Sequence, residues 1–310
     1  MLHASSMHNT FLKIALPVLL GVTLLWAAGG CEQRSSSHPL VGEPIIVSPD
    51  SHRDLQELFD SLDYDFGSID HGVPHIILTQ LPDDMDQLDD IKEKKRIFFL
   101  SLLPMVLMAN EEIAYKRSRL KSIIESHERG ALVTESDREW AENLASDYRL
   151  SGDPLEQPEL KIRLLRRVDI IPPSLVLAQA ANESGWGTSR FAQAANNIFG
   201  EWTFIPGTGL VPRDRPEGAK YEVRKFDTLY QSLNSYMRNL NTHRAYRPLR
   251  SIRAGMRENG RTPSGVALAR GLEKYSSRSE AYVNDIQQMI RQNDLTKLSR
   301  VYLDGMQIAN

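Results

Sequence analysis

The longest stretch of hydrophobic positions at helical spacing lies between residues 92 and 127. Apolar side chains recur there every three or four residues, at Ile97, Leu100, Leu103, Leu107 and Met108, and this spacing predicts a helix. Pro104 falls inside the run, and because proline lacks an amide hydrogen we expect a kink or a break there. The pattern predicts two further helices in this half of the chain, at about 134–148 and 158–168.

The C-terminal half begins with a shorter apolar helix, expected over about 173–184. Proline is favoured in the first turn of a helix and glycine just past its end, and Pro173 and Gly185 bound the segment in this way. The remaining elements are a strand in the alternating stretch 221–227 and helices over about 228–240 and 281–291. The pattern as a whole predicts a mainly α chain with a small β element.

The N-terminus carries a separate signal. Residues 14–28 contain no charge and follow Lys13, but the run is shorter than the roughly 20 apolar residues that cross a bilayer, so it fits a secretory signal peptide. The small residues before Cys31 resemble a bacterial lipobox, which implies a lipid anchor on that cysteine. Glu32 resembles the signal that sorts a Gram-negative lipoprotein to the outer membrane, facing the periplasm. The alternative is a plain signal peptide, or an anchor, with an incidental cysteine.

The chain divides by composition into five segments. Residues 1–30 form the signal peptide, and 31–72 begin with serine and proline and are expected to be a tether followed by a disordered or irregular segment. Residues 73–160 form an N-terminal helical region. Residues 161–300 carry the candidate chemistry, and 301–310 form a tail.

Composition and charge exclude several classes of function. The 310 residues include one cysteine, which rules out an intramolecular disulfide and any cysteine-rich metal site. No His-Glu-x-x-His pair occurs, and His71 and His75 lie among glycine and proline as loop residues. A net charge of −3 gives no footprint for nucleic-acid binding. We therefore expect no nucleic-acid partner and no metal or organic cofactor.

Glu183 stands in the last turn of the predicted 173–184 helix. The negative end of the helix dipole disfavours an ionised carboxylate there, and burial beside Trp186 would disfavour it further. A carboxyl group that stays protonated near neutral pH is what a glycosidase needs to protonate a leaving sugar oxygen. The structural alternative is a helix-end glutamate that only bonds a neighbouring backbone amide.

The segment that follows Glu183 resembles a known enzyme family. The residues that carry the likeness are Ser184-Gly185-Trp186-Gly187, Asn196-Asn197-Ile198-Phe199-Gly200 and Arg224-Lys225-Phe226 before a helix. They resemble the glucosaminidase domain of glycoside hydrolase family 73, over about 165–285. Gly209-Leu210-Val211-Pro212 and Asn239-Leu240-Asn241-Thr242-His243 are similar to its Bax-like branch, and this likeness extends upstream to about residue 73. The resemblance implies a lysozyme-like, mainly α (α+β) body with a small β-hairpin lobe, an N-terminal helical extension and a groove between the lobes.

By this resemblance Glu183 is the general acid and peptidoglycan is the substrate. Hydrolysis by a carboxylate pair needs a second acid across the cleft. We favour Glu217, in the loop before the predicted strand, over Glu222, with Glu201 third. Assistance by the acetamido group of the substrate would need no second carboxylate.

Several other side chains are candidates for contact with sugar. Aromatic rings can stack on sugar faces, and the candidates for substrate binding are Trp186, Asn197, Phe199, Trp202 and Tyr282. Phe199 is more simply a core residue. Tyr275 is expected either to bond the substrate or a catalytic carboxylate, or to pack on the helix at 281–291.

Arginines recur at spacings of three and four between residues 244 and 261. They are Arg244, Arg247, Arg250, Arg253, Arg257 and Arg261. We expect them to line one helical face, which is either solvated or meets an anionic glycan or a phospholipid surface.

The leading hypothesis is an envelope-anchored endo-β-N-acetylglucosaminidase that cleaves the β-1,4 bond after N-acetylglucosamine and hydrolyses no amide. One alternative on the same fold is a lytic transglycosylase, in which the muramic 6-hydroxyl attacks internally. A second alternative is a non-catalytic glycan-binding envelope lipoprotein. A binder has no need of the Glu183 carboxyl, and the products separate the two enzymes.

Overall fold

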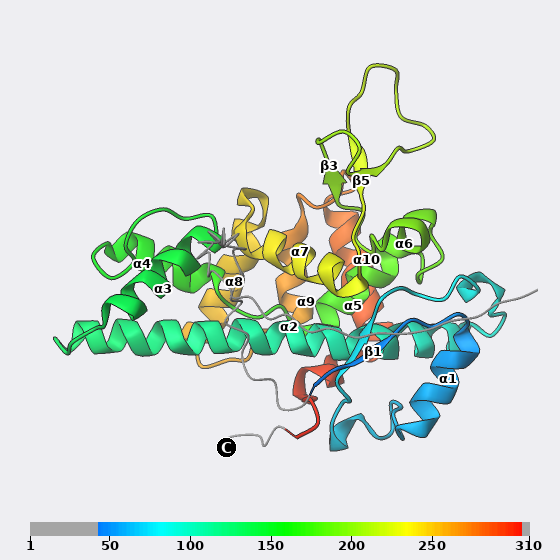
Figure 1. Cartoon of the computed structure of the whole chain (residues 1–310), viewed down its shortest axis with the longest axis horizontal. Helices are drawn as coiled ribbons and strands as arrows, with labels where there is room; N and C mark the ends of the chain where they lie inside the picture. The colour runs from blue at the N-terminus through cyan, green and yellow to red at the C-terminus, as the bar shows by residue number, and fades with distance from the viewer. Residues whose placement is uncertain (1–42, 306–310) are drawn as a thin grey trace, which may run out of the picture. The chain divides into compact units, whose positions relative to one another are not determined.

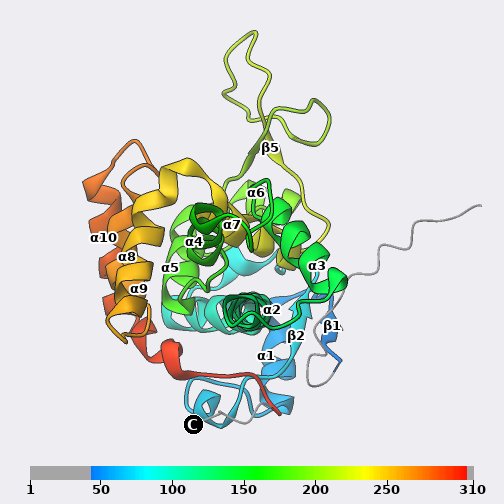
Figure 2. The same cartoon turned by 90° about the vertical axis from the view of Figure 1, so that its left-hand side faces the viewer.

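The computed structural model describes residues 43–305. The predicted signal peptide, the proposed lipidation site Cys31 and the start of the predicted tether lie outside the described residues. Among the described residues the architecture is mainly helical with two small sheets (Figures 1 and 2). The predicted fold class, mainly α with a small β component, is therefore confirmed.

The central element is helix α2 (Ile91–Glu128), whose N-terminus is capped by the side chain of Asp90. Every residue from 97 to 110 is buried, because α2 packs against both α5 (Pro173–Ser184) and α7 (Leu229–Thr242). The helix runs through Pro104 without a break, so the predicted break is wrong. Its 38 residues are long and apolar enough to cross a membrane, but 83% of that apolar window is buried inside the fold, as in a core helix.

Residues 43–72 are folded, which corrects the prediction of a tether and irregular segment up to residue 72. β1 (Ile45–Val47) pairs in parallel with β2 (Ile76–Leu78). Helix α1 (His52–Ser61) buries Leu55 and Phe59 in the core. The sequence signal was weak because α1 has only these two buried positions in its ten residues.

The predicted tail at 301–310 is likewise folded in its first part. Val301 and Leu303 are buried, and Leu303 forms a parallel bridge with Val73. The segment from 301 to 305 therefore closes onto the start of the helical region instead of leaving the fold.

Five more helices surround these elements in the described part of the chain. Helices α3 (Glu135–Asp147) and α4 (Pro158–Arg167) bury apolar residues against the last turns of α2, in a cluster separate from the main core. Helices α9 (Gly265–Leu268) and α10 (Glu280–Gln292) pack on α5, and α8 (Arg247–Glu258) packs on α4 and α9. The predicted helices at 134–148, 158–168, 173–184, 228–240 and 281–291 are all present to within two residues.

The β-lobe consists of β3 (Trp202–Thr203), β4 (Gly209–Leu210) and β5 (Glu222–Arg224), which follow helix α6 (Arg190–Ala195). The central strand β5 pairs antiparallel with both neighbours. Figures 1 and 2 show this lobe and its loops projecting from the helices. Asn197 fixes the lobe to the helices, because its buried amide donates to the carbonyls of Glu201 and Arg224, each at 2.8 Å.

The arginine stripe of α8 forms part of the core. Arg253 is 1% exposed and donates to the carbonyls of Asp169 and Ile170, while Arg257 binds the Asp169 carboxylate at 2.7 Å. Arg250 is buried as well and donates to the carbonyl of Leu240. The middle of the stripe thus ties α8 to the segment after α4, and the expectation of one open face is wrong.

Candidate functional site

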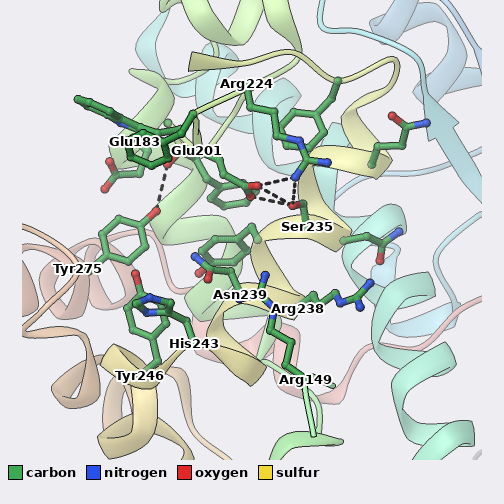
Figure 3. Close-up of a pocket in the computed structure, with 18 residues that line it drawn as sticks. Arg149, Glu183, Glu201, Arg224, Ser235, Arg238, Asn239, His243, Tyr246 and Tyr275 are labelled. Carbon is green, nitrogen blue, oxygen red and sulfur yellow. Dashed lines mark hydrogen bonds and ion pairs between the residues drawn. The ribbon is translucent and has the colours of Figure 1, made fainter. Parts of the chain in front are cut away.

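A groove of about 1130 Å³ contains Glu183 in its wall (Figure 3). Its lining comes from α5, from the β-lobe, from α7 and from the turns after α3 and α7. Typical small-molecule pockets measure roughly 300–1,000 Å³. The groove is therefore large enough for several linked sugar units.

The position of Glu183 is set by the way in which α5 ends. Gly185 adopts a left-handed conformation with φ of 57°, and Trp186 and Gly187 follow with φ of 62° and 81°. A Cβ atom on Gly187 would lie 2.6 Å from a methyl carbon of the buried Leu81, so a side chain at position 187 would displace Leu81 as well as strain the backbone. The turn reverses the chain directly after Glu183.

Trp186 is not among the described residues that line the groove. Its ring makes edge contacts with Phe98 and Phe99 of α2, at centroid distances of 5.8 and 5.3 Å. The ammonium group of Lys95 lies 4.9 Å from the same ring. This placement corrects the expectation that Trp186 stacks on sugar, because the indole is engaged with the core helix.

Two donors converge on one oxygen of Glu183. The hydroxyl of Tyr282 donates to Oε1 at 2.7 Å, and the amide of Asn182 donates to the same atom at 3.1 Å. Within residues 43–305, no protein donor bonds Oε2. When Glu183 is protonated, the proton therefore belongs on Oε2, because Oε1 already accepts two hydrogen bonds.

A chain of buried hydrogen bonds holds Tyr282 in place. Gln179, one turn before Glu183 on α5, donates through Nε2 to the Tyr282 hydroxyl at 2.8 Å. The Oε1 atom of Gln179 accepts from the hydroxyl of Tyr236 at 2.5 Å. Gln179, Tyr236 and Tyr282 are each at most 2% exposed. Because every polar atom in the chain has a partner, the network fixes the orientation of the carboxyl group.

Four tyrosines surround Glu183. Burial raises the pKa of Tyr236, Tyr246, Tyr275 and Tyr282, and the charge of Glu183 raises each pKa further. For Tyr246 the pKa is raised to about 12. All four hydroxyls thus stay protonated near neutral pH and act as hydrogen-bond donors or acceptors, never as bases.

Glu201, which the sequence ranked third, lines the groove together with Glu183. Its Oε1 atom forms an ion pair with Arg224 at 2.7 Å, and the Ser235 hydroxyl lies 2.9 and 2.8 Å from its two oxygens (Figure 3). The ion pair and the hydroxyl contacts hold this carboxylate in one position. Glu201 is the second carboxylate of the lining among the described residues, and it is already paired.

Glu222 and Glu217 do not belong to the lining. The carboxylate of Glu222 accepts the backbone amides of Gly207 and Gly209 at 3.0 and 2.9 Å, so it fastens the turn between β3 and β4. These backbone bonds lower the pKa of Glu222. Glu217 is exposed in the loop between β4 and β5.

The other predicted contact residues are divided between the core and the groove. Phe199 is 6% exposed and stacks on Tyr236 with ring centroids 3.7 Å apart, yet it also reaches the lining. Trp202 is 51% exposed in the lining and is the tryptophan best placed to meet a sugar face. Tyr275 lines the groove and donates to the carbonyl of Phe199 at 3.2 Å. Asn197 and Tyr282 are buried supports of the site.

Sequence reasoning missed several residues of the site. Gln179 left a signal, since it is a polar residue on the same helical face as Glu183 within an otherwise apolar helix. Arg149 and Arg238 left none, because they come from separate elements that only the fold brings together, whereas His243 entered only as the end of the Asn239–His243 motif.

Comparisons with known proteins identify the domain that contains most of this groove. Residues 159–295 match the glucosaminidase family described as mannosyl-glycoprotein endo-beta-N-acetylglucosaminidase. The chain is 31% identical over 202 residues to protein bax of Escherichia coli (strain K12), which covers 64% of this chain and 70% of that protein. No solved structure matches the chain. Glu183 and most of the groove lining fall inside the matched domain, whereas Arg149 lies before it.

Proposed function

The chain belongs to the Bax-like family of glucosaminidase-domain proteins, and from this membership and the groove we propose that it is an endo-β-N-acetylglucosaminidase acting on peptidoglycan. It cleaves the β-1,4 bond after N-acetylglucosamine. The observation that carries the proposal is the Glu183 carboxyl, held by Tyr282 and Asn182 through Oε1 with Oε2 left for a proton.

Glu183 acts as the general acid. Its Oε2 proton passes to the glycosidic oxygen while the bond from that oxygen to the anomeric carbon breaks. Water then adds to the anomeric carbon and gives its proton to the Glu183 carboxylate, which restores the acid. Tyr282 stays bonded to Oε1 throughout and keeps the carboxyl group in one orientation. Proton transfer by a positioned group of this kind contributes about 10²- to 10⁴-fold to the rate.

The identity of the second catalytic group distinguishes a glucosaminidase from a lytic transglycosylase. Glu201 lines the groove but is engaged by Arg224 and Ser235. This pairing supports a reaction in which the substrate itself supplies the second group. The acetamido oxygen does so in a glucosaminidase, and the muramic 6-hydroxyl does so in a lytic transglycosylase.

A digest of purified peptidoglycan tests these proposals. Wild type is expected to release products with reducing-end N-acetylglucosamine, and Glu183→Gln is expected to lose at least a hundredfold in rate. Anhydro-muramic ends would replace the glucosaminidase assignment with the transglycosylase. Tight glycan binding without any product from wild type would favour a binding protein instead.

We further propose that the protein is lipid-anchored through Cys31 and faces the periplasm from the outer membrane of a Gram-negative bacterium. The support is the sequence around that cysteine. Such an anchor would place the groove within reach of the wall polymer.

A further inference from the structure

The end of the groove away from Glu183 is basic. Arg149, Arg238 and His243 line it, and Figure 3 draws these three residues away from Glu183. The guanidinium group of Arg238 donates to the carbonyl of Asp147, which places it beside the turn that carries Arg149. Arg238 and His243 come from α7 and its C-terminal cap and Arg149 from the turn after α3, and only the tertiary fold brings Arg149 to the other two.

No carboxylate of the described groove lining pairs with the positive charge at this end. In the described part of the chain, Arg149, Arg238 and His243 form no ion pair, and the guanidinium of Arg149 makes no hydrogen bond. The two lining carboxylates do not cancel it, since Glu201 pairs with Arg224 and Glu183 lies at the opposite end. Burial and the like charges of Arg163, Arg149 and Arg247 lower the pKa of Arg167, so the surrounding cations repel one another.

The turn that presents Arg149 is built to hold it. Arg149 has a left-handed backbone with φ of 57°, which is uncommon for a residue other than glycine. Arg167 of α4 donates to the carbonyls of Tyr148 and Arg149, and Arg238 donates to that of Asp147. The carbonyls at the end of α3 are thus satisfied from two other helices, and the turn is fixed at the groove.

His243 offers a neutral donor at the same place. Its Nδ1 atom accepts the backbone amide of Ala245 at 3.3 Å, so the ring proton belongs on Nε2. Burial and the charges of Arg149, Arg244 and Arg250 lower the pKa of His243, which keeps the ring neutral near pH 7. Two guanidinium groups and one N–H donor form a donor set that suits a carboxylate.

We propose that Arg149, Arg238 and His243 form a subsite for a carboxylate carried by the glycan strand. The inference rests on the proposed function, because the groove must hold a glycan for the subsite to meet its substituents. In peptidoglycan such a carboxylate belongs either to the lactyl group of a strand without peptides or to the stem peptide. Arg149 lies before the matched 159–295 domain, so the helical extension supplies part of the substrate preference.

Equilibrium binding to soluble oligosaccharides tests the subsite without relying on turnover. The protein carries Glu183→Gln so that no ligand is consumed. The probes are peptide-bearing peptidoglycan oligomers, the same oligomers stripped of peptide, and a neutral N-acetylglucosamine oligomer of equal length. The test variant adds Arg149→Gln and Arg238→Gln, and the control adds Arg129→Gln and Arg291→Gln, which remove two exposed arginines outside the groove lining.

We expect the test variant to lose at least tenfold in affinity for one of the two anionic probes and less than twofold for the neutral probe. The anionic probe for which the variant loses affinity identifies the source of the carboxylate. Arg149→Gln alone is expected to give part of the same loss, and its guanidinium supports no hydrogen bond in the described structure. The loss should shrink in high salt, because charge attraction is screened.

Equal loss for neutral and anionic probes, or no loss for any probe, would overturn the subsite. Salt-dependent binding to anionic lipid vesicles with no preference among the oligosaccharides would overturn it in favour of membrane contact. Selective, arginine-dependent binding by a protein whose wild type yields no product would keep the subsite and reject the hydrolase. An active wild type without this selectivity would keep the hydrolase and reject the subsite.

Discussion

The hydroxyl of Tyr282 donates a 2.7 Å hydrogen bond to Oε1 of Glu183, across 99 positions of the chain. The bond joins α10 to the last turn of α5, and Gln179 and Tyr236 continue it into the core. The packing of α10 against α5 thus sets the orientation of the proposed acid, and the residues that line the groove do not.

Tyr282→Phe removes only the hydroxyl that holds Glu183. We expect kcat to fall about ten- to a hundredfold with KM changed less than twofold, because Tyr282 is buried and does not line the groove. Stability should fall by about 1–3 kcal/mol, since Gln179 loses its acceptor. Steady-state kinetics on peptidoglycan oligomers and urea unfolding measure the two effects.

Tyr230→Phe is the matched control for this variant. Tyr230 donates to the carboxylate of Glu112 at 3.1 Å, away from the groove lining. It should lose stability without losing kcat. An unchanged kcat in Tyr282→Phe would remove Tyr282 from its positioning role.

Glu217→Gln and Glu201→Gln test the second carboxylate. Glu217 is exposed and outside the lining, so its replacement is expected to leave the rate within about twofold. Replacing Glu201 frees Arg224 and should lower kcat/KM about tenfold, through loss of a fixed groove wall. Single-turnover rates on one defined oligomer measure both, and a loss of a thousandfold or more in either variant would identify that residue as the second catalytic group.

Trp202→Ala should weaken substrate binding, whereas Trp186→Ala should lower stability. Trp202 lies half exposed in the groove, so its loss should raise KM about tenfold with kcat little changed, equivalent to about 1.4 kcal/mol of binding. Trp186 packs on Phe98 and Phe99, so its loss should lower the unfolding free energy and spare KM. Chemical unfolding with oligosaccharide titration distinguishes the two, and a raised KM in folded Trp186→Ala would restore it as a sugar contact.

Asp169 holds the buried arginines of α8, and Asp169→Asn should lower the unfolding free energy at pH 7 by about 3–5 kcal/mol. Burial raises the pKa of Asp169, but the hydrogen bond from Arg257 and the charges of Arg253 and Arg117 outweigh burial and lower it. Because the folded-state pKa lies below the unfolded one, this stability is present above about pH 4 and is lost as pH falls through the folded pKa.

Urea unfolding of wild type and Asp169→Asn between pH 7 and pH 3.5 measures this linkage. The difference in unfolding free energy between wild type and Asp169→Asn should become smaller below pH 4. Asp137→Asn, which breaks a partly exposed pair with Arg119, serves as the control and should cost less than about 1 kcal/mol. A difference that stays constant down to pH 3.5 would contradict the assignment.

Cys31→Ser tests the proposed lipid anchor. Wild type should co-sediment with outer-membrane vesicles and incorporate labelled fatty acid, whereas the variant should do neither. The folded body should be unaffected. Circular dichroism of the released protein, which reports its helix content, checks this. Labelling that persists in the variant would exclude Cys31 as the anchor point.

Local chemistry was sufficient for the helix that carries Glu183. Pro173 at its start and Gly185 at its end predicted α5 with the right bounds, because prolines and left-handed glycines act within one turn of the backbone. The prediction failed where local rules were outweighed. Pro104 did not break α2, because apolar packing all round that helix compensates the lost backbone bond.

The sequence by itself therefore determined the mainly helical class, the bounds of α5 and the candidate acid Glu183, since periodicity and helix-end residues report on neighbouring backbone. Only the tertiary structure decided what faces that acid. It placed Glu201 in the groove in preference to Glu217 and Glu222, turned Trp186 into the core, and gathered Arg149 and Arg238 from separate helices. Such contacts arise when distant elements pack, and no pattern within a single element encodes which of its side chains will meet across a groove.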